Sequence, residues 1–181
     1  MGAGMQRVPI ELERVLLRPP RPEDAEMVYR NWGTDAEVAK FVTWRPHASI
    51  EDTRAFLAFA GARWDEGTEF TWLICLKSSG EPIGAISLRK EQFKAGIGYV
   101  LSRRQWGRGL ILEAARRVLD IAFADARIFR VGAYCDVENT RSARVLEKLG
   151  MTLEGTLKGW LVHPALGEQP RDCLSYSIVR R

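Results

Sequence analysis

The sequence predicts an α+β domain in which a mixed sheet carries helices on its faces. Three consecutive segments have strand composition and are separated by turns, which is typical of a meander. Strand and helix patterns then alternate to the end of the chain, which favours a sheet covered by helices. The 181 residues show no internal repeat or linker, so residues 1–181 are expected to form a single domain.

The first third of the chain is expected to contain one strand and two helices. Leu12–Arg18 has the composition of a strand. A helix should run from Pro22 to about Trp32, because proline fits a first helical position and the two acids after it complement the positive helix end. A second helix should begin near Ser49, which has an aspartate three positions later, the spacing of a capping box, and end at Gly67.

The middle of the chain changes to strand periodicity. Phe70–Leu76, Ile83–Arg89 and Ala95–Leu101 are rich in aromatic and branched residues, and the sequence KSSGEP separates the first two. A long helix follows, because apolar residues recur along one face. These residues are Ile111, Ala114, Ala115, Val118, Ala122 and Ala126.

The last third alternates strands with a short helix. Phe129–Cys135 is expected to be a strand, and Ser142–Leu149 a helix that Gly150 ends in a left-handed conformation. Two further strands, 151–162 and 173–179, complete the sheet.

Composition excludes several classes of protein. The three cysteines are odd in number and widely spaced, so no disulfide framework or zinc site is expected, and we predict a cytoplasmic protein without a metal. No apolar run approaches the roughly 20 residues of a membrane span. The net charge of +4 is matched by residues 103–117, which hold five arginines and one glutamate. These arginines flank one loop without an aromatic RNA-binding pattern, so nucleic-acid binding is not expected.

The most informative segment is YVLSRRQWGRGLILEAARR, residues 99–117. A predicted strand ends near Leu101, a short loop contains Arg104, Gly107 and Gly109, and a helix opens near Leu110. Glycines let successive backbone N–H groups point to one spot, and a helix start adds unpaired donors and positive charge. The segment therefore predicts an anion site suited to a pyrophosphate. It lacks GxxxxGK[ST] and completes no GxGxxG, so neither an NTPase loop nor a dinucleotide fingerprint is present. A glycine turn with solvated arginines is the alternative.

Here the residues resemble a family. Arg104-x-x-Gly107-x-Gly109 looks like the acyl-CoA loop of the GNAT N-acetyltransferases. The strings IGYVL, QWGRG, EAA and RVLEKLGM, in this order, resemble the RimJ/RimL-type branch, as do LLRPPRPEDA near the start and RDCLSYSIV near the end. The resemblance covers nearly the whole chain. It implies a three-layer α/β/α fold with a mostly antiparallel sheet, and acetyl-CoA as co-substrate.

The resemblance also implies which residues form the site. The loop N–H groups would hold the pyrophosphate, the strand edge at Tyr99–Leu101 would pair with the pantetheine, and Asn139 would contact the same arm. Ser142, one helical turn further, is the candidate proton donor to the sulfur, and Asn139 and Ser142 are the candidate catalytic residues. As a local matter, both side chains are also suited to capping the short helix. The expected cofactor-binding residues are Tyr99, Val100, Leu101, Arg104, Gln105, Trp106, Gly107, Arg108, Gly109, Leu110, Asn139 and Ser142.

Two positions depart from the family pattern. Many relatives carry a glutamate where this chain has Gly96, and others carry a tyrosine where it has Leu146. The usual acid and base are therefore missing, and three carboxylates are possible substitutes: Asp136, Glu138 and Glu154. Asp136 and Glu138 are expected to lie in solvent. Catalysis by positioning alone is a further alternative, because orientation can supply about 7–11 kcal/mol of a barrier.

Several readings of function stay open from the sequence. The leading hypothesis is acetyl transfer to a primary amine, either a protein N-terminal amine or a small-molecule amine. A non-catalytic acyl-CoA-binding sensor is the alternative, and the chain is expected to be a monomer or homodimer. Acceptor pockets are expected in segments 30–50 and 157–171. His47 and His163 neighbour prolines and are expected at the surface, and Cys135 is expected to be buried and unreactive.

Overall fold

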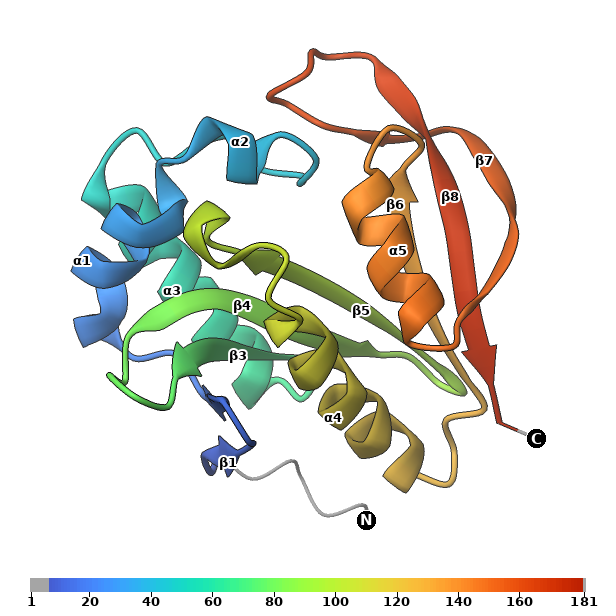
Figure 1. The fold of residues 1–181 in the computed structure, drawn as a ribbon, viewed down its shortest axis with the longest axis horizontal. Coiled ribbons are helices and arrows are strands. Elements are labelled where there is room, and N and C mark those ends of the chain that lie inside the picture. The colour runs from blue at the N-terminus through green and yellow to red at the C-terminus, as the bar shows by residue number, and fades with distance from the viewer. Residues whose placement is uncertain (1–6, 181) are drawn as a thin grey trace.

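The computed structural model describes residues 7–180, in which eight strands form one sheet in the order β1-β2-β3-β4-β5-β6-β8-β7 (Figure 1). All neighbouring strands are antiparallel except β5 and β6, which are parallel. The strands are β1 (Ile10–Glu11), β2 (Val15–Arg18), β3 (Glu69–Leu76), β4 (Pro82–Lys90), β5 (Lys94–Leu101), β6 (Arg130–Asp136), β7 (Thr152–Val162) and β8 (Pro170–Val179).

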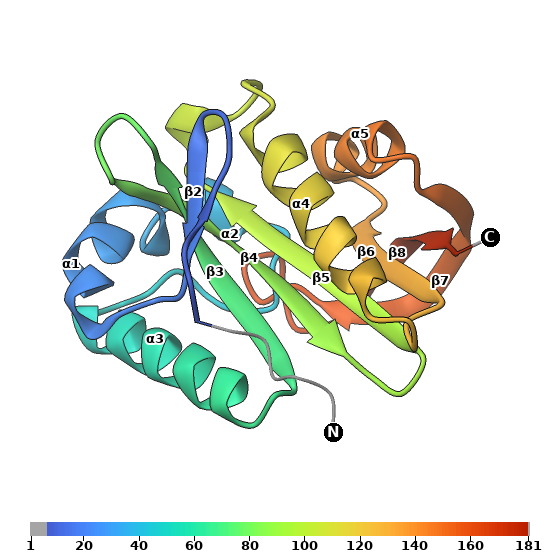
Figure 2. The ribbon, with the colours of Figure 1, turned by 90° about the horizontal axis from the view of Figure 1, so that it is seen from below.

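Helices cover both faces of the sheet. In Figure 1, α4 and α5 lie in front of the strands and α3 lies behind them, and Figure 2 shows the same layers from below. This arrangement is the predicted three-layer α+β fold. The helical segments are η1 (Pro22–Asp24), α1 (Ala25–Val28), η2 (Tyr29–Gly33), α2 (Ala36–Ala39), α3 (Ile50–Asp65), η3 (Arg103–Gln105), α4 (Leu110–Ala124) and α5 (Thr140–Lys148).

The parallel pair β5–β6 is short, and this determines the shape of the molecule. Pairing covers only Lys94–Gly96 against Arg130–Gly132, although β5 continues to Leu101 and β6 to Asp136. The remaining parts of the two strands diverge, and Figure 1 shows them separating toward the top of the view. The sheet therefore opens into a splay whose two edges carry backbone groups without a neighbouring strand.

Most predicted elements are confirmed, and local signals explain their ends. The helix expected from Ser49 is α3, and the Asp52 carboxylate accepts a hydrogen bond from the Ser49 N–H at 3.1 Å. The short helix α5 ends as expected, because Gly150 has φ +81° and the Met151 N–H donates to the Leu146 carbonyl at 3.1 Å.

Three details differ from the prediction. Residues 22–33 form a 3₁₀ turn, four α-helical residues and a π turn rather than one regular helix. The unpredicted α2 has Asp35 as its N-cap, and the Asp35 side chain accepts from the Glu37 N–H. The placement of Ala126 on the long helix was wrong, because Asp125 turns the chain by accepting from the Arg127 N–H at 3.1 Å, and Ala126 is exposed beyond the helix end. No helix among residues 7–180 is long and apolar enough to cross a membrane.

Candidate active site

The loop between β5 and α4 presents a group of backbone donors. Gly107 and Gly109 have φ of +77° and +74°, left-handed values that favour glycine, and Gly109 is the N-cap of α4. The Glu113 N–H donates to the Gly109 carbonyl at 3.1 Å, the first bond of the helix. The N–H groups of the preceding turn therefore have no partner within α4, and they add to the positive end of the helix. This geometry is that of an anion site.

Arg14, distant in the sequence, holds this loop by hydrogen bonds. Its backbone N–H and its Nε each donate to the Glu113 carboxylate at 2.8 Å, and its Nη1 donates to the Arg108 carbonyl at 2.8 Å. Burial raises the pKa of Glu113, but the hydrogen bonds from Arg14 lower it by more, so the carboxylate remains charged. Sequence reasoning missed Arg14, because nothing local connects positions 99 residues apart.

Two of the expected donors are already occupied. The N–H groups of Gln105 and Trp106 donate to carbonyls earlier in the same turn. Trp106 also donates its Nε1–H to the Leu101 carbonyl at 2.8 Å, and the Arg141 guanidinium lies 4.5 Å from its ring centroid. Trp106 therefore anchors the loop to β5. Arg104, Gly107, Arg108 and Gly109 are exposed, whereas Leu110 is buried.

One buried atom in this loop has no partner. Gln105 Oε1 has no hydrogen-bond partner among the described residues. Buried oxygens are usually satisfied, so this atom is suited to a donor supplied by a ligand. The unpaired N–H groups are suited to a pyrophosphate, and Gln105 Oε1 is suited to a hydrogen-bond donor from the rest of the same ligand.

The edge of β5 faces the splay. The Ser102 N–H donates to the Ile83 carbonyl of β4 at 2.7 Å, and backbone groups alternate between the two sides of a strand. The backbone N–H and C=O groups of Tyr99 and Leu101 therefore point away from β4. They have no partner in β6, because β5 pairs with β6 only as far as Gly96. Val100 points its backbone toward β4, and its side chain packs against the apolar cluster under α1 and α3.

Three predicted residues, one from β5 and two from the start of α5, meet beside this edge. The Tyr99 and Ser142 hydroxyl oxygens are 2.9 Å apart, and Asn139 Oδ1 accepts from the Ser142 N–H at 3.2 Å. Asn139 is therefore the cap of α5, while the Ser142 side chain faces the splay residue Tyr99. Burial raises the pKa of Tyr99 far above its ordinary value, although the bond to Ser142 lowers it, so the phenol keeps its proton.

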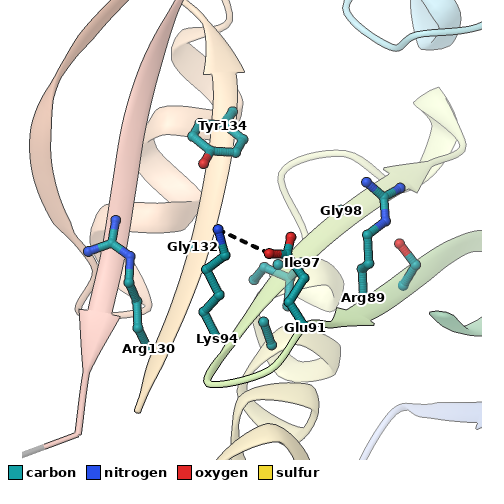
Figure 3. A pocket seen from close by; sticks show the side chains of 11 residues that line it. Arg89, Glu91, Lys94, Ile97, Gly98, Arg130, Gly132 and Tyr134 are labelled. Carbon is teal, nitrogen blue, oxygen red and sulfur yellow. Dashed lines mark ion pairs between the residues drawn. The ribbon is translucent and has the colours of Figure 1, made fainter. Parts of the chain in front are cut away.

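A cavity of about 200 Å³ lies on the other face of the β5–β6 junction (Figure 3). Its floor contains three glycines, which lack side chains on this face of the two strands. Arg89, Arg130 and Tyr134 contribute to its sides, and Glu91 and Lys94 lie at the hairpin end. The floor glycines are Gly96, Gly98 and Gly132.

Comparisons with known proteins assign the chain and its fold to a family. The Acetyltransferase (GNAT) domain family matches residues 14–152, more than half of the chain. The chain belongs to the GNAT acetyltransferase family. It is 30% identical over 151 residues to the uncharacterized N-acetyltransferase p20 of Bacillus licheniformis, a match that covers 82% of this chain and 84% of that protein.

Two solved structures have the same GNAT fold. A GNAT-family acetyltransferase from Bacillus anthracis superposes with a TM-score of 0.82 at 30% identity, covering 95% of this chain and 98% of that one. RimL, a ribosomal alpha-N-protein acetyltransferase in complex with coenzyme A, gives a TM-score of 0.84 at 21% identity, covering 95% and 98%. At that identity, RimL shows the fold alone. The chain is a GNAT N-acetyltransferase, as the sequence motifs predicted.

Within this acetyltransferase, Asp136 and His163 are not where the sequence placed them. Asp136 was expected in solvent but is fully buried, and it accepts from Arg171 Nε at 2.6 Å and Nη2 at 3.2 Å and from the Glu138 N–H at 2.8 Å. Burial raises the pKa of Asp136, but these bonds lower it by more. His163 was expected at the surface but is 2% exposed, with Nδ1 3.3 Å from the Val42 carbonyl and Nε2 3.5 Å from Asp136 Oδ2. Packing between the end of β6 and the residues that follow β7 buries both groups.

The remaining carboxylates proposed as bases are also engaged. Glu154 forms an ion pair with Arg130, which lowers the pKa of Glu154 to about 2, and it accepts from the Ser177 hydroxyl at 2.8 Å. Glu138 is exposed and lies 3.1 Å from Arg171. Cys135 is buried as predicted, and burial raises its pKa to about 11. His47, also expected at the surface, is half-buried, and its Nδ1 lies 2.7 Å from the Thr53 hydroxyl.

Proposed function

We propose that this N-acetyltransferase uses acetyl-CoA as the acetyl donor and a protein N-terminal amine as the acceptor. The observation that carries the proposal is the junction of two features. The unpaired N–H groups at the start of α4 lie at the mouth of the splay, and the Tyr99–Ser142 hydroxyl pair lies beside the same strand edge. An anion site next to an unpaired strand edge suits a ligand with a pyrophosphate at one end and an amide-containing arm.

Acetyl-CoA would be bound by backbone groups more than by side chains. The N–H groups from Gly107 through Leu110 would hold the pyrophosphate, and Arg104 and Arg108 would raise the positive potential around it. The backbone of Tyr99 and Leu101 would pair with the pantetheine amides as an added strand would. Asn139 uses its Oδ1 to cap α5, which leaves its Nδ2 hydrogens for the same arm.

The chemistry requires an oriented thioester, a stabilised oxyanion and a protonated leaving sulfur. The Tyr99 N–H points into the splay and would donate to the developing oxyanion. Ser142 would donate its hydroxyl proton toward the leaving sulfur, with the Tyr99 hydroxyl 2.9 Å away to hold its orientation. Because the Tyr99 phenol keeps its proton, it can support Ser142 as a donor throughout the neutral pH range.

The choice of a protein N-terminal amine as acceptor is supported by the fold neighbour and by the cavity. RimL, which shares the fold, is a ribosomal alpha-N-protein acetyltransferase. The cavity beside the splay is lined mainly by glycine backbone and by charged and hydroxyl side chains, which suits a peptide better than an apolar amine. The two segments that were expected to form the acceptor pocket meet where His163 lies against the Val42 carbonyl.

A panel of acceptors tests the proposal. The purified protein is incubated with acetyl-CoA and either peptides with a free N-terminus, the same peptides with a blocked N-terminus, or small amines, while CoA release and product mass are recorded. We expect turnover with free peptides and none with blocked ones. Turnover with small amines alone would overturn the acceptor assignment, and acetyl-CoA binding without turnover on any amine would indicate a sensor.

A further inference from the structure

We propose that His163 is a positioning residue: when its ring carries a second proton, it ties the loop of residues 40–47 to Asp136 at the end of β6, and this contact strengthens acceptor binding. The loop lies between α2 and α3, within one of the two segments in which an acceptor pocket was expected. The inference deepens the proposed function and rests on it, because it concerns how the same site holds its amine acceptor.

The loop of residues 40–47 joins the two arms of the splay. On the side of α3, the His47 N–H donates to the Gly33 carbonyl at 2.8 Å. On the side of β6, the Val42 carbonyl lies 3.3 Å from His163 Nδ1. Figure 1 shows α2 and the loop after it reaching across the top of the view toward the β7–β8 connection. The loop is therefore held on both arms, and His163 supplies a contact on the β6 side.

Both ring nitrogens of His163 face oxygen atoms that can only accept a hydrogen bond. Nδ1 faces the Val42 carbonyl, and Nε2 lies 3.5 Å from Asp136 Oδ2 without a hydrogen-bond partner among the described residues. A neutral imidazole carries one N–H, so it can donate to one of these oxygens and directs a lone pair at the other. The imidazolium form can donate to both. The geometry therefore suits the charged ring, which joins the loop to β6.

The charges beside His163 on β6 and β8 also favour the imidazolium. Asp136 is fully buried and pairs with Arg171, whose guanidinium also lies 3.1 Å from the exposed Glu138. The two carboxylates and the guanidinium sum to −1, so a charged His163 makes this cluster neutral. Buried charges are normally paired, and the second proton on His163 supplies the missing positive charge.

The loop itself contributes two cations, Lys40 and Arg45. Arg45 is exposed. The Lys40 ammonium lies 5.3 Å from the centroid of the Phe41 ring, and that ring packs edge-on against the His163 ring with centroids 6.3 Å apart. Lys40 opposes a second proton on His163, but the Asp136 carboxylate faces the imidazole directly at 3.5 Å, and Coulomb energies fall with distance.

Asp136 also connects the loop to the candidate catalytic residues. Its carbonyl accepts from the Asn139 N–H at 2.8 Å, and Asn139 Oδ1 accepts from the Ser142 N–H at 3.2 Å. A loop tied to Asp136 therefore has a fixed position relative to Ser142. When the ring of His163 is neutral, it releases one of its two oxygens, and the loop becomes a less rigid wall for the acceptor.

The first experiment observes the ring itself. The chain has two histidines, His47 and His163, so nitrogen-15 spectra of their imidazoles are assigned by comparison with His47→Gln. At pH 6 we expect both nitrogens of His163 to carry a proton, because histidine changes its charge between about pH 5 and 8. A ring that is neutral at pH 6 would overturn the proposal. This measurement needs no variant of His163, so it decides even where such a variant does not fold.

The second experiment compares the parent with His163→Gln at each pH, using a peptide with a free N-terminus. Both enzymes meet the same ionisation of the acceptor amine, so the ratio of their KM values isolates the ring. Where the ring is charged, we expect the peptide KM to be about 3–10-fold higher in His163→Gln, the effect of about one lost hydrogen bond. We expect kcat and acetyl-CoA affinity to change little. The ratio should fall to about 1 where the ring is neutral, and a ratio that is constant with pH would overturn the proposal.

His47→Gln is the matched control. His47 lies in the same loop, but its Nδ1 lies 2.7 Å from the Thr53 hydroxyl, which can donate or accept. Either neutral form of His47 is therefore satisfied, and burial lowers its pKa. We expect the KM ratio between His47→Gln and the parent to be the same at every pH. A ratio that changes with pH as it does for His163→Gln would overturn the assignment to His163.

Hydrogen exchange of residues 40–47 tests the contact without turnover. We expect faster exchange in His163→Gln than in the parent where the parent ring is charged, and equal exchange there would overturn the proposal. If the parent turns over no amine, the proposed function fails, but the ring spectrum and the exchange rates still decide whether His163 ties the loop to Asp136.

Discussion

Replacing Asp136 with alanine should destabilise the protein strongly, because this buried carboxylate joins the end of β6 to the start of β8. It accepts two hydrogen bonds from Arg171 and one from the Glu138 N–H, and none of its surface is exposed. Removing one partner of a buried ion pair costs about 3–5 kcal/mol. The Arg171 side chain is 29% exposed and keeps Glu138 at 3.1 Å, so we expect the lower end, about 3 kcal/mol.

Urea unfolding of the parent, Asp136→Ala, Arg171→Ala and the double variant measures this loss and the coupling between the two side chains. For a domain of this size, about 3 kcal/mol corresponds to a drop of roughly 6–12 °C in melting temperature. Asp65→Ala is the control, because its pair with Arg7 is exposed and should contribute less than about 1 kcal/mol. A loss below about 1 kcal/mol in Asp136→Ala, or additive single variants, would refute the reasoning.

Three other predictions follow from the site and the sheet. Gly109→Val should abolish acetyl-CoA binding in titration calorimetry. The control Gly67→Val, at a similar positive φ of +70° in open space, should lose similar stability and still bind acetyl-CoA. Equal affinity in the two variants would contradict the loop assignment. Ser142→Ala should lower kcat by about 10²–10⁴-fold with little change in acetyl-CoA affinity, and full activity would remove Ser142 from the catalytic residues. The pKa of Glu154 falls from 4.5 to about 2 on folding, so its contribution to stability is present above pH 4.5 and lost as the pH falls through about 2. The unfolding free energies of the parent and Glu154→Gln should therefore converge in acid, and a constant gap would contradict this.

Local signals in the sequence predicted most of the fold. The acid three residues after Ser49, the glycine at 150 and the change from helical to strand period at Phe70 each act over a few residues, so their structural outcome is readable from the chain. The glycine loop was predictable for the same reason, because two left-handed glycines before a helix determine where its N–H groups point.

Contacts between distant segments could not be predicted. Arg14 reaches Glu113 across 99 residues, and His163 reaches the Val42 carbonyl across 121, and no periodicity marks either partner. Tyr99 and Ser142 were both named from the sequence, but their hydroxyl contact depends on how the splay places α5 beside β5. The same tertiary packing buries Asp136, which its sequence context did not indicate.

If the N–H groups at the start of α4 and the adjacent splay bind acetyl-CoA, this ligand should raise the melting temperature of the protein. A ligand that binds only the folded state at a hundred times its Kd adds about 2.7 kcal/mol of stability. For this chain length we therefore expect the melting temperature to rise by roughly 5–10 °C at saturating acetyl-CoA. No rise at millimolar acetyl-CoA would contradict the account.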